Sequence, residues 1–300
     1  MQVLTNILEK WTLSHKLLIN IAIAGLLLFL VFIFKYPIFF KNTAYSCTRE
    51  AVKKSVYLKT WDWDTLESPH FTLKYQPTEG NVAQLILSTA ETAFQPVNNF
   101  LEFTPEGKIP VIVYPTQEQM NKSFGWDADE NAMGVYWAGV IRILSPNDWV
   151  SDSSLLAEEF SKNGPMAHEY THLVVDYLTK GNYPRWLTEG IAQYVEREVT
   201  GFQFPVPVVQ GNDNNLYSLT QLDKQYDSLP NQSLAYGQSL AAIDYYIETC
   251  GVESLRNLLA DLSEGKTIQA AIAINTGQSL EDFEQCYQKW SNNKYFLQAN

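Results

Sequence analysis

The chain contains the stretch GPMAHEYTHLVV at residues 164–175, and two of its four histidines lie there. His168 and His172 are four residues apart, and Glu169 follows the first of them. On an α-helix, side chains four residues apart project from the same face, so the two imidazoles can bind one metal ion. Glu169 would then reach a water molecule on that ion. The stretch predicts a metal site on a helix.

The limits of this helix follow from the residues around it. Asn163, Gly164 and Pro165 are typical of a helix start, and Gly181 after Lys180 is a stop signal. A helix within these limits is shorter than the roughly 20 apolar residues that span a bilayer, and it carries charged side chains. The motif is therefore not expected inside a membrane.

A catalytic zinc ion usually takes three protein ligands and keeps its fourth position for water, so two histidines are not enough. The next predicted helix begins at Pro184, ends at Gly201 and offers Glu189. Seventeen residues separate Glu189 from His172, enough for a short turn and an antiparallel return. Gly190 and Ala192 are small, which would allow close packing against the first helix.

The motifs HEYTH at 168–172 and WLTEGIA at 186–192 together resemble the two-part signature of the gluzincin metallopeptidases. The similarity is to the peptidase-MA-like group in particular, and more distantly to the aminopeptidase N and thermolysin lineages. It implies a zincin-like domain with Zn²⁺ bound by His168, His172 and Glu189, and with Glu169 as the catalytic carboxylate. In the thermolysin lineage an aspartate four residues after the ligand glutamate supports a histidine. Gln193 stands at that place here, so this support is not carried over.

The part after the active-site helices has a helical pattern almost to the end of the chain. Its stretch Tyr236-Gly237-Gln238-Ser239 is similar to the Tyr-x-x-Gly helix start of the aminopeptidase relatives, with Ser239 in place of glycine. There the tyrosine hydroxyl binds the tetrahedral intermediate, and a phenol suits a developing oxyanion. Tyr236 is therefore a candidate catalytic residue. The alternative is a packing or surface role, since the chain has 17 tyrosines.

The part before the active-site helices alternates strand and helix patterns, which predicts an α+β domain with a small mixed sheet. Strands are expected at 70–75, 109–114 and 134–144, and helices at 82–100 and 117–124. His70 has no second ligand nearby, so it is interpreted as a polar residue at a strand end. The two glycines of 134–144 would let another backbone approach, as at an edge strand that binds an extended peptide. An ordinary strand with a bulge is the alternative.

Residues 17–34 are apolar except for Asn20 and Gly25, and lysines bound them on both sides. A helix of this length matches the hydrocarbon thickness of a bilayer, which predicts an uncleaved single-pass anchor. We expect a tail and anchor at 1–41, a basic juxtamembrane linker at 42–60 and the peptidase domain at 61–300. The lysines and arginines after the anchor would place the domain in the cytoplasm, whereas the signal-anchor layout would export it. We expect an extracytoplasmic domain.

Charge is unevenly distributed along the chain. Residues 1–60 carry a balance of +6 and the remaining residues −18. Nucleic acid is not an expected partner of so acidic a domain, because phosphate binding requires a cationic face. The three cysteines form no Cys-x-x-Cys pair. Cys250 and Cys286 could form a disulfide in an oxidising compartment, or both could be buried thiols.

These observations predict a membrane-anchored zinc metallopeptidase in which Glu169 takes the proton of a zinc-activated water. Its partner would be a peptide or protein substrate. The aminopeptidase motif that binds a free amino terminus is absent, since Asn131-Ala132-Met133-Gly134 has no glutamate. This favours an endopeptidase. The alternatives are a zinc-binding scaffold without activity, and a zinc amidase that acts on a non-peptide or cell-wall substrate.

Overall fold

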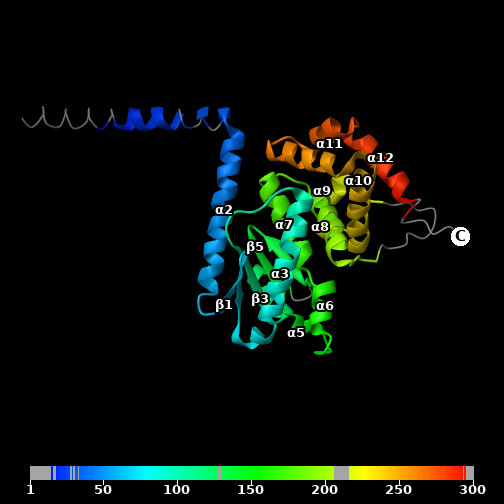
Figure 1. Cartoon of the computed structure of the whole chain (residues 1–300). Helices are drawn as coiled ribbons and strands as arrows, with labels where there is room; N and C mark the ends of the chain where they lie inside the picture. The colour runs from blue at the N-terminus through cyan, green and yellow to red at the C-terminus, as the bar shows by residue number, and fades with distance from the viewer. Residues whose placement is uncertain are drawn as a thin grey trace, which may run out of the picture. The chain divides into compact units, whose positions relative to one another are not determined.

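The computed structural model describes residues 34–127, 130–205 and 216–292, together with residues 15, 18–27, 29, 31, 32 and 294. The chain divides into two compact units, Met1–Cys47 and Thr48–Asn300. The second unit contains the sheet and most of the helices (Figure 1). It has the α+β organisation with a small mixed sheet that the sequence predicts.

In the first unit, the described residues from 18 to 35 are helical. Within the described ranges, no helix combines the length and apolar character needed to cross a membrane. Part of the predicted anchor at 17–34 lies outside the described residues, namely Leu17, Leu28, Leu30 and Ile33. The anchor therefore stays a prediction from the sequence.

The sheet has five strands in the order β1-β2-β3-β5-β4. Strands β2 (Phe71–Tyr75), β3 (Ile109–Tyr114) and β5 (Val140–Leu144) run parallel in its centre. The edge strands β1 (Asp64–Glu67) and β4 (Gly134–Trp137) are antiparallel to their neighbours. The hairpin β4-β5 brings the edge strand β4 beside α7 (Met166–Thr179), the helix that carries the His168–His172 motif.

The prediction of one continuous strand at 134–144 is wrong, because a tight turn divides this segment into β4 and β5. Ala138 and Gly139 both have positive φ, 48° and 84°. Two successive residues of this kind form the turn that suits the twist of a two-residue hairpin. Glycine adopts such a conformation readily, and the pattern of apolar residues alone does not reveal the turn.

Successive side chains of the central strands point to opposite faces of the sheet, and each face is covered by helices. One face packs on α3 (Gly80–Leu101) and α7 (Met166–Thr179) through Val111, Val113, Ile141 and Ile143. The other packs on α4 (Gln117–Phe124) and on the last part of α2 (Pro37–Lys59) through Ile112, Tyr114, Val140 and Leu144. Helix α7, which carries His168 and His172, is thus held directly against the sheet.

Residues 42–60, predicted as a linker, are helical as far as Lys59, where α2 ends. From Thr48 onward they belong to the same compact unit as the sheet. The physical reason is apolar burial, since Val56 joins the core on that face of the sheet and Val52 packs beside it. The basic residues of this stretch had suggested a solvated linker, but its valines cover the sheet.

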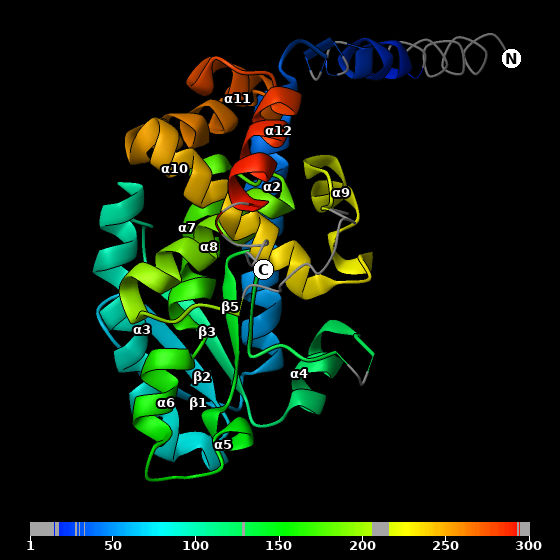
Figure 2. The same cartoon turned by 90° about the vertical axis from the view of Figure 1, so that its right-hand side faces the viewer.

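Short helices α5 (Pro146–Trp149) and α6 (Leu156–Asn163) connect β5 to α7. Helix α8 (Arg185–Thr200) follows α7, and the described residues from 216 to 292 are mostly helical, as predicted: α9 (Leu219–Lys224), η2 (Tyr226–Ser228), α10 (Gln232–Ser263), α11 (Ile268–Thr276) and α12 (Leu280–Ser291). Helix α10 is broken at Gly251, whose φ is 81°. Figure 2 shows α10, α11 and α12 grouped at the α8 side of the unit, away from β1 and β2.

Candidate metal centre

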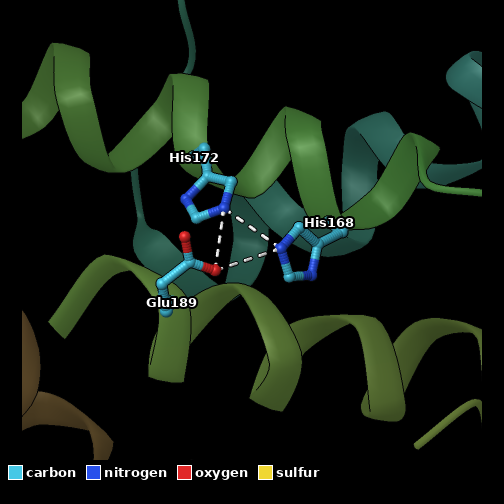
Figure 3. A group of neighbouring side chains, drawn as sticks. All are labelled: His168, His172 and Glu189. Carbon is cyan, nitrogen blue, oxygen red and sulfur yellow. Dashed lines mark hydrogen bonds and ion pairs between the residues drawn. The ribbon is translucent and has the colours of Figure 1, made fainter. Parts of the chain in front are cut away.

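Helices α7 and α8 place three potential ligand atoms together. Nε2 of His168 lies 3.1 Å from Nε2 of His172, and Oε2 of Glu189 lies 3.5 Å from each of them. Figure 3 shows the three side chains directed toward one another between the two helices. They form a group that could hold a metal ion, and the sequence had predicted this set.

The spacing of these atoms suits zinc. Zinc–ligand bonds are about 2.0–2.1 Å, and a tetrahedral arrangement of such bonds places the ligand atoms about 3.3 Å apart. Oε2 of Glu189 is buried, and within the described part of the chain it has no hydrogen-bond partner. Leaving a buried carboxylate oxygen unpaired costs free energy, which a bound cation would recover. The donor set therefore fits a zinc ion.

Each imidazole is oriented through its other nitrogen by a residue of α8. Nδ1 of His168 lies 3.1 Å from Oε2 of Glu196, and Nδ1 of His172 lies 2.7 Å from Oγ1 of Thr188. A carboxylate only accepts hydrogen bonds, so Nδ1 of His168 carries the proton and Nε2 is free to bind a metal. These two supporting contacts were not predicted from the sequence.

The negative charges of Glu196 and Glu189 around His168 favour positive charge in this part of the site. Burial opposes the charged form of the imidazole, but Glu196 and Glu189 outweigh it and raise the pKa of His168. Burial would likewise raise the pKa of Glu189, but the two histidines and Arg185 lower it well below its usual value. Glu189 is therefore an anion, and the pocket that it shares with the histidines attracts positive charge.

The second oxygen of Glu189 is held by Arg185 from the preceding turn of α8. The Arg185 guanidinium donates to Oε1 of Glu189 at 2.8 Å and lies 3.4 Å from Asp227. One carboxylate oxygen is thus fixed by an arginine while the other faces the histidines. This division orients Glu189 for binding a metal through a single oxygen.

Glu169 is buried beside the three ligands and is fixed by the edge strand. The backbone N–H of Tyr136 in β4 donates to Oε2 of Glu169 at 2.6 Å. Burial raises the pKa of Glu169, Glu189 adds to the effect, and the two histidines oppose it. A carboxylate with a raised pKa is suited to accept and release a proton.

Gly134 lets strand β4 approach Glu169 this closely. A Cβ atom at Gly134 would lie 2.7 Å from Cγ of Glu169 and 2.8 Å from Cβ of Pro165. The sequence predicted that the glycines of this segment let another backbone approach closely at an edge strand. In the structure, β4 is an edge strand, but Gly134 admits the side chain of Glu169 rather than a backbone.

The site opens into a cavity of about 1380 Å³, lined by the three ligands, Glu169 and Tyr236 among others. Tyr236 is half-buried in the second turn of α10. The nearby charge of Glu189 raises its pKa, and burial adds to this, so the phenol keeps its proton. The structure therefore brings Tyr236 into the same cavity as the other predicted site residues.

Gly190 packs against α10 and not against α7, the helix that the sequence had suggested. A Cβ at Gly190 would lie 2.2 Å from the carbonyl oxygen of Ser239 and 2.5 Å from Cγ1 of Ile243, both in α10. The small residue therefore allows α8 to approach α10, whereas the sequence had suggested α7. Sequence spacing indicates that a helix makes a close contact but does not identify its partner.

Comparisons with known proteins were made on the sequence and on the fold. The family model described as Peptidase MA superfamily matches residues 102–293. No curated protein matches the chain. A solved structure that the chain resembles is that of a mutant M1 zinc metallopeptidase from Deinococcus radiodurans, with 11% sequence identity and a TM-score of 0.38. The match covers 78% of this chain and 52% of that one, so the chain spans about half the length of that protein.

Proposed function

Because the chain belongs to the Peptidase MA superfamily, we propose that it is a zinc-dependent metallopeptidase of the gluzincin type. One observation carries this proposal: Nε2 of His168, Nε2 of His172 and Oε2 of Glu189 are 3.1–3.5 Å apart and enclosed between two helices. These three residues would hold the zinc ion. The set contains two imidazoles and one carboxylate, as in catalytic zinc sites that leave a position for water.

When bound, zinc supplies a Lewis acid that polarises the scissile carbonyl and lowers the pKa of a water molecule. The protein groups then move the proton. Glu169 accepts it from the attacking water and passes it to the leaving amine. The backbone N–H of Tyr136 holds Oε2 of Glu169 at 2.6 Å, which keeps the carboxylate directed at the site.

Tyr236 is our candidate for binding the oxyanion. Its hydroxyl group lies in the same cavity as Glu169 and Glu189, and its raised pKa keeps it a hydrogen-bond donor. A donor aimed at the charge that develops on the carbonyl oxygen stabilises the transition state. We expect Tyr236→Phe to lower kcat more than it raises KM.

We further propose that the substrate is an internal peptide bond of a peptide or protein. The cavity extends along the edge strand β4 and is lined there by Gly134, Val135, Tyr136 and Trp137. Such a length of lining accommodates an extended chain on both sides of the scissile bond. The absence of a glutamate at residues 131–134 also speaks against binding of a free amino terminus.

The location of the protein is a proposal from the sequence. The apolar segment 17–34 supports attachment to a membrane, and the signal-anchor layout supports an extracytoplasmic domain. Fusion of a reporter to the C-terminus, active only outside the cytoplasm, would test the orientation.

The test of the activity compares the wild type with Glu169→Gln on a peptide library. We expect hydrolysis by the zinc-loaded wild type, and a fall in kcat of at least about 10²-fold in the variant, because a carboxamide cannot accept the proton. Zinc content should remain the same in both proteins. Glu158→Gln, an exposed glutamate on α6, is the matched control and should retain full activity.

Two results would contradict the proposal. Full activity of Glu169→Gln would remove the assigned proton acceptor. A zinc-loaded wild type that cleaves no member of the library would favour a metal-binding scaffold or an amidase with a non-peptide substrate.

A further inference from the structure

Arg142 is a buried cation in the wall of the cavity. It lies on β5, its exposed fraction is 5%, and its Nη1 atom has no hydrogen-bond partner among the residues that the structure describes. It lines the same cavity as the candidate metal centre. None of the roles assigned above uses this side chain.

The surroundings of Arg142 hold the guanidinium but do not neutralise it. The ring of Phe124 lies 4.6 Å from its Cζ atom and that of Trp137 lies 5.8 Å away, so aromatic faces flank the charge. Burial lowers the pKa of Arg142, and Tyr114 opposes this. No carboxylate of the described residues forms an ion pair with it. A buried charge without an anionic partner is costly, and an anion that enters the cavity would relieve this cost.

The register of the hairpin places the side chain of Arg142 on the face of the sheet that packs on α2 and α4, opposite the face that packs on α7. Arg142 is paired with Val135 across the β4-β5 ladder, so their side chains share a face of the sheet and lie about 5 Å apart at Cβ. The next residue of β4, Tyr136, donates its backbone N–H to Glu169. Glu169 and Arg142 therefore line the cavity from opposite sides of strand β4, and a substrate extended along β4 would direct alternate side chains toward each of them.

We propose that Arg142 binds a carboxylate of the substrate and so makes the enzyme prefer an acidic residue near the scissile bond. This inference rests on the proposed peptidase function. A guanidinium donates two parallel hydrogen bonds to a carboxylate, a geometry that a neutral amide does not match. The flanking rings of Phe124 and Trp137 restrict the guanidinium, which lowers the entropy lost on binding.

The experiment compares matched quenched-fluorescence peptides that carry Glu or Gln at each position around one cleavage site. With the zinc-loaded full-length chain, kcat/KM should be roughly tenfold to a hundredfold higher for Glu than for Gln at one position. A second pair of peptides, with a free or an amidated C-terminus, distinguishes a side-chain carboxylate from a terminal one.

Three variants identify the residue responsible. Arg142→Met keeps most of the volume and removes the charge, so the Glu and Gln peptides should be cleaved at similar rates. Arg142→Lys keeps the charge without the planar fork and should retain part of the preference. Lys59→Met removes another cation that lines the cavity and should leave the preference unchanged.

Equal cleavage of all Glu and Gln pairs by the wild type would overturn the inference, as would an unchanged preference in both Arg142 variants. Binding of the same peptides to Glu169→Gln, measured by fluorescence anisotropy, separates this inference from the proposed function. Tighter binding of the Glu peptide that depends on Arg142, without cleavage by the wild type, would support the carboxylate subsite and contradict the peptidase. Cleavage without an acidic preference would support the peptidase and contradict the carboxylate subsite.

Discussion

At the scale of single residues, the candidate site depends on how α8 supports the histidines of α7. In the thermolysin lineage the residue four positions after the ligand glutamate supports a histidine. Gln193 occupies that position here, but its side chain donates instead to the backbone oxygens of Glu189 and Tyr236. The carboxylate that supports His168 comes from Glu196, seven residues after Glu189. Seven residues are almost two helical turns, so both glutamates face α7. From that spacing, Glu196 could have been predicted as a residue that faces the histidines.

Glu196→Gln should weaken metal binding while preserving the fold. A neutral amide holds Nδ1 of His168 less strongly than a carboxylate does, and loss of such an outer contact typically costs about 10–100-fold in metal affinity. Zinc affinity would be measured by competition with a chromophoric chelator. Glu198→Gln, two residues further on and exposed, is the control and should bind zinc like the wild type. Unchanged affinity in Glu196→Gln would contradict the supporting role.

At the scale of elements, α8 is the central helix of the site, because it contacts both α7 and α10 closely. Its residues Thr188, Glu189 and Glu196 face the histidines, and Gly190 faces α10. A change in the packing of α8 on α10 should therefore be transmitted to the metal ligands. The sequence predicted both α7 and α8, but a helix pattern does not tell which neighbour lies on which side.

Gly190→Ala tests this packing. The added Cβ would lie 2.2 Å from the carbonyl oxygen of Ser239, so α8 and α10 would have to separate. Overpacking of this kind costs about 1–3 kcal/mol in the free energy of unfolding, and zinc affinity should fall with it. Denaturant titration would measure the stability. Gly80→Ala, where an added Cβ meets no atom within 4 Å, should be neutral, and equal stability of the two variants would refute the argument.

The start of β2 is joined to α3 through a pair that responds to acid. Glu91 accepts hydrogen bonds from the backbone N–H of His70 at 2.9 Å and lies 2.7 Å from Nδ1 of its ring. The ring of His70 also stacks on Phe94. His70 is thus engaged structurally, as expected for a polar residue at a strand end.

Burial alone would raise the pKa of Glu91, but hydrogen bonds from Ser68 and His70 outweigh it and lower the pKa. The folded-state value is therefore below the unfolded value of about 4.3. The pair stabilises the fold above that pH, and the contribution is lost as the pH falls through the folded-state pKa. Because the pair is partly exposed, we expect only about 0.5 kcal/mol. In denaturant titrations between pH 5 and 2, Glu91→Gln should lack this loss of unfolding free energy. A pH profile identical to that of the wild type would contradict the role of the pair.

At the scale of the whole molecule, the sequence predicted the family and the grouping of the candidate ligands better than the topology. The motifs at 168–172 and 186–192 led to the correct family, because metal ligands at helical spacing leave a local pattern. The division of 134–144 by a turn depends on two positive φ angles, which the apolar pattern does not record. The helical form of residues 48–59 depends on contacts with strands β3 and β5, which lie more than 50 residues later in the chain.

A zinc ion held by α7 and α8 should stabilise the whole folded unit. A ligand that binds only the folded state adds about 4 kcal/mol when its free concentration is a thousand times Kd. For a unit of this size we expect Tm to fall by about 10 °C when zinc is removed with a chelator and to recover when zinc is added back. Scanning calorimetry would measure both steps. Glu169→Gln should show the same shift as the wild type, whereas His172→Ala should show little, and a shift that survives in His172→Ala would place the zinc elsewhere.

The two-residue turn at Ala138 and Gly139 has a consequence for how the chain can change in evolution. It fixes the register in which β4 lies against β5, and a slip of one residue would exchange the faces of every side chain in β4. The N–H of Tyr136 would then no longer meet Glu169, and Val135 would no longer lie beside Arg142. Insertions and deletions in this turn should therefore be rare among active relatives, and Gly139 is itself buried beside Arg49 and Lys53. The length of this turn is in this way set by the position of a carboxylate inside the molecule.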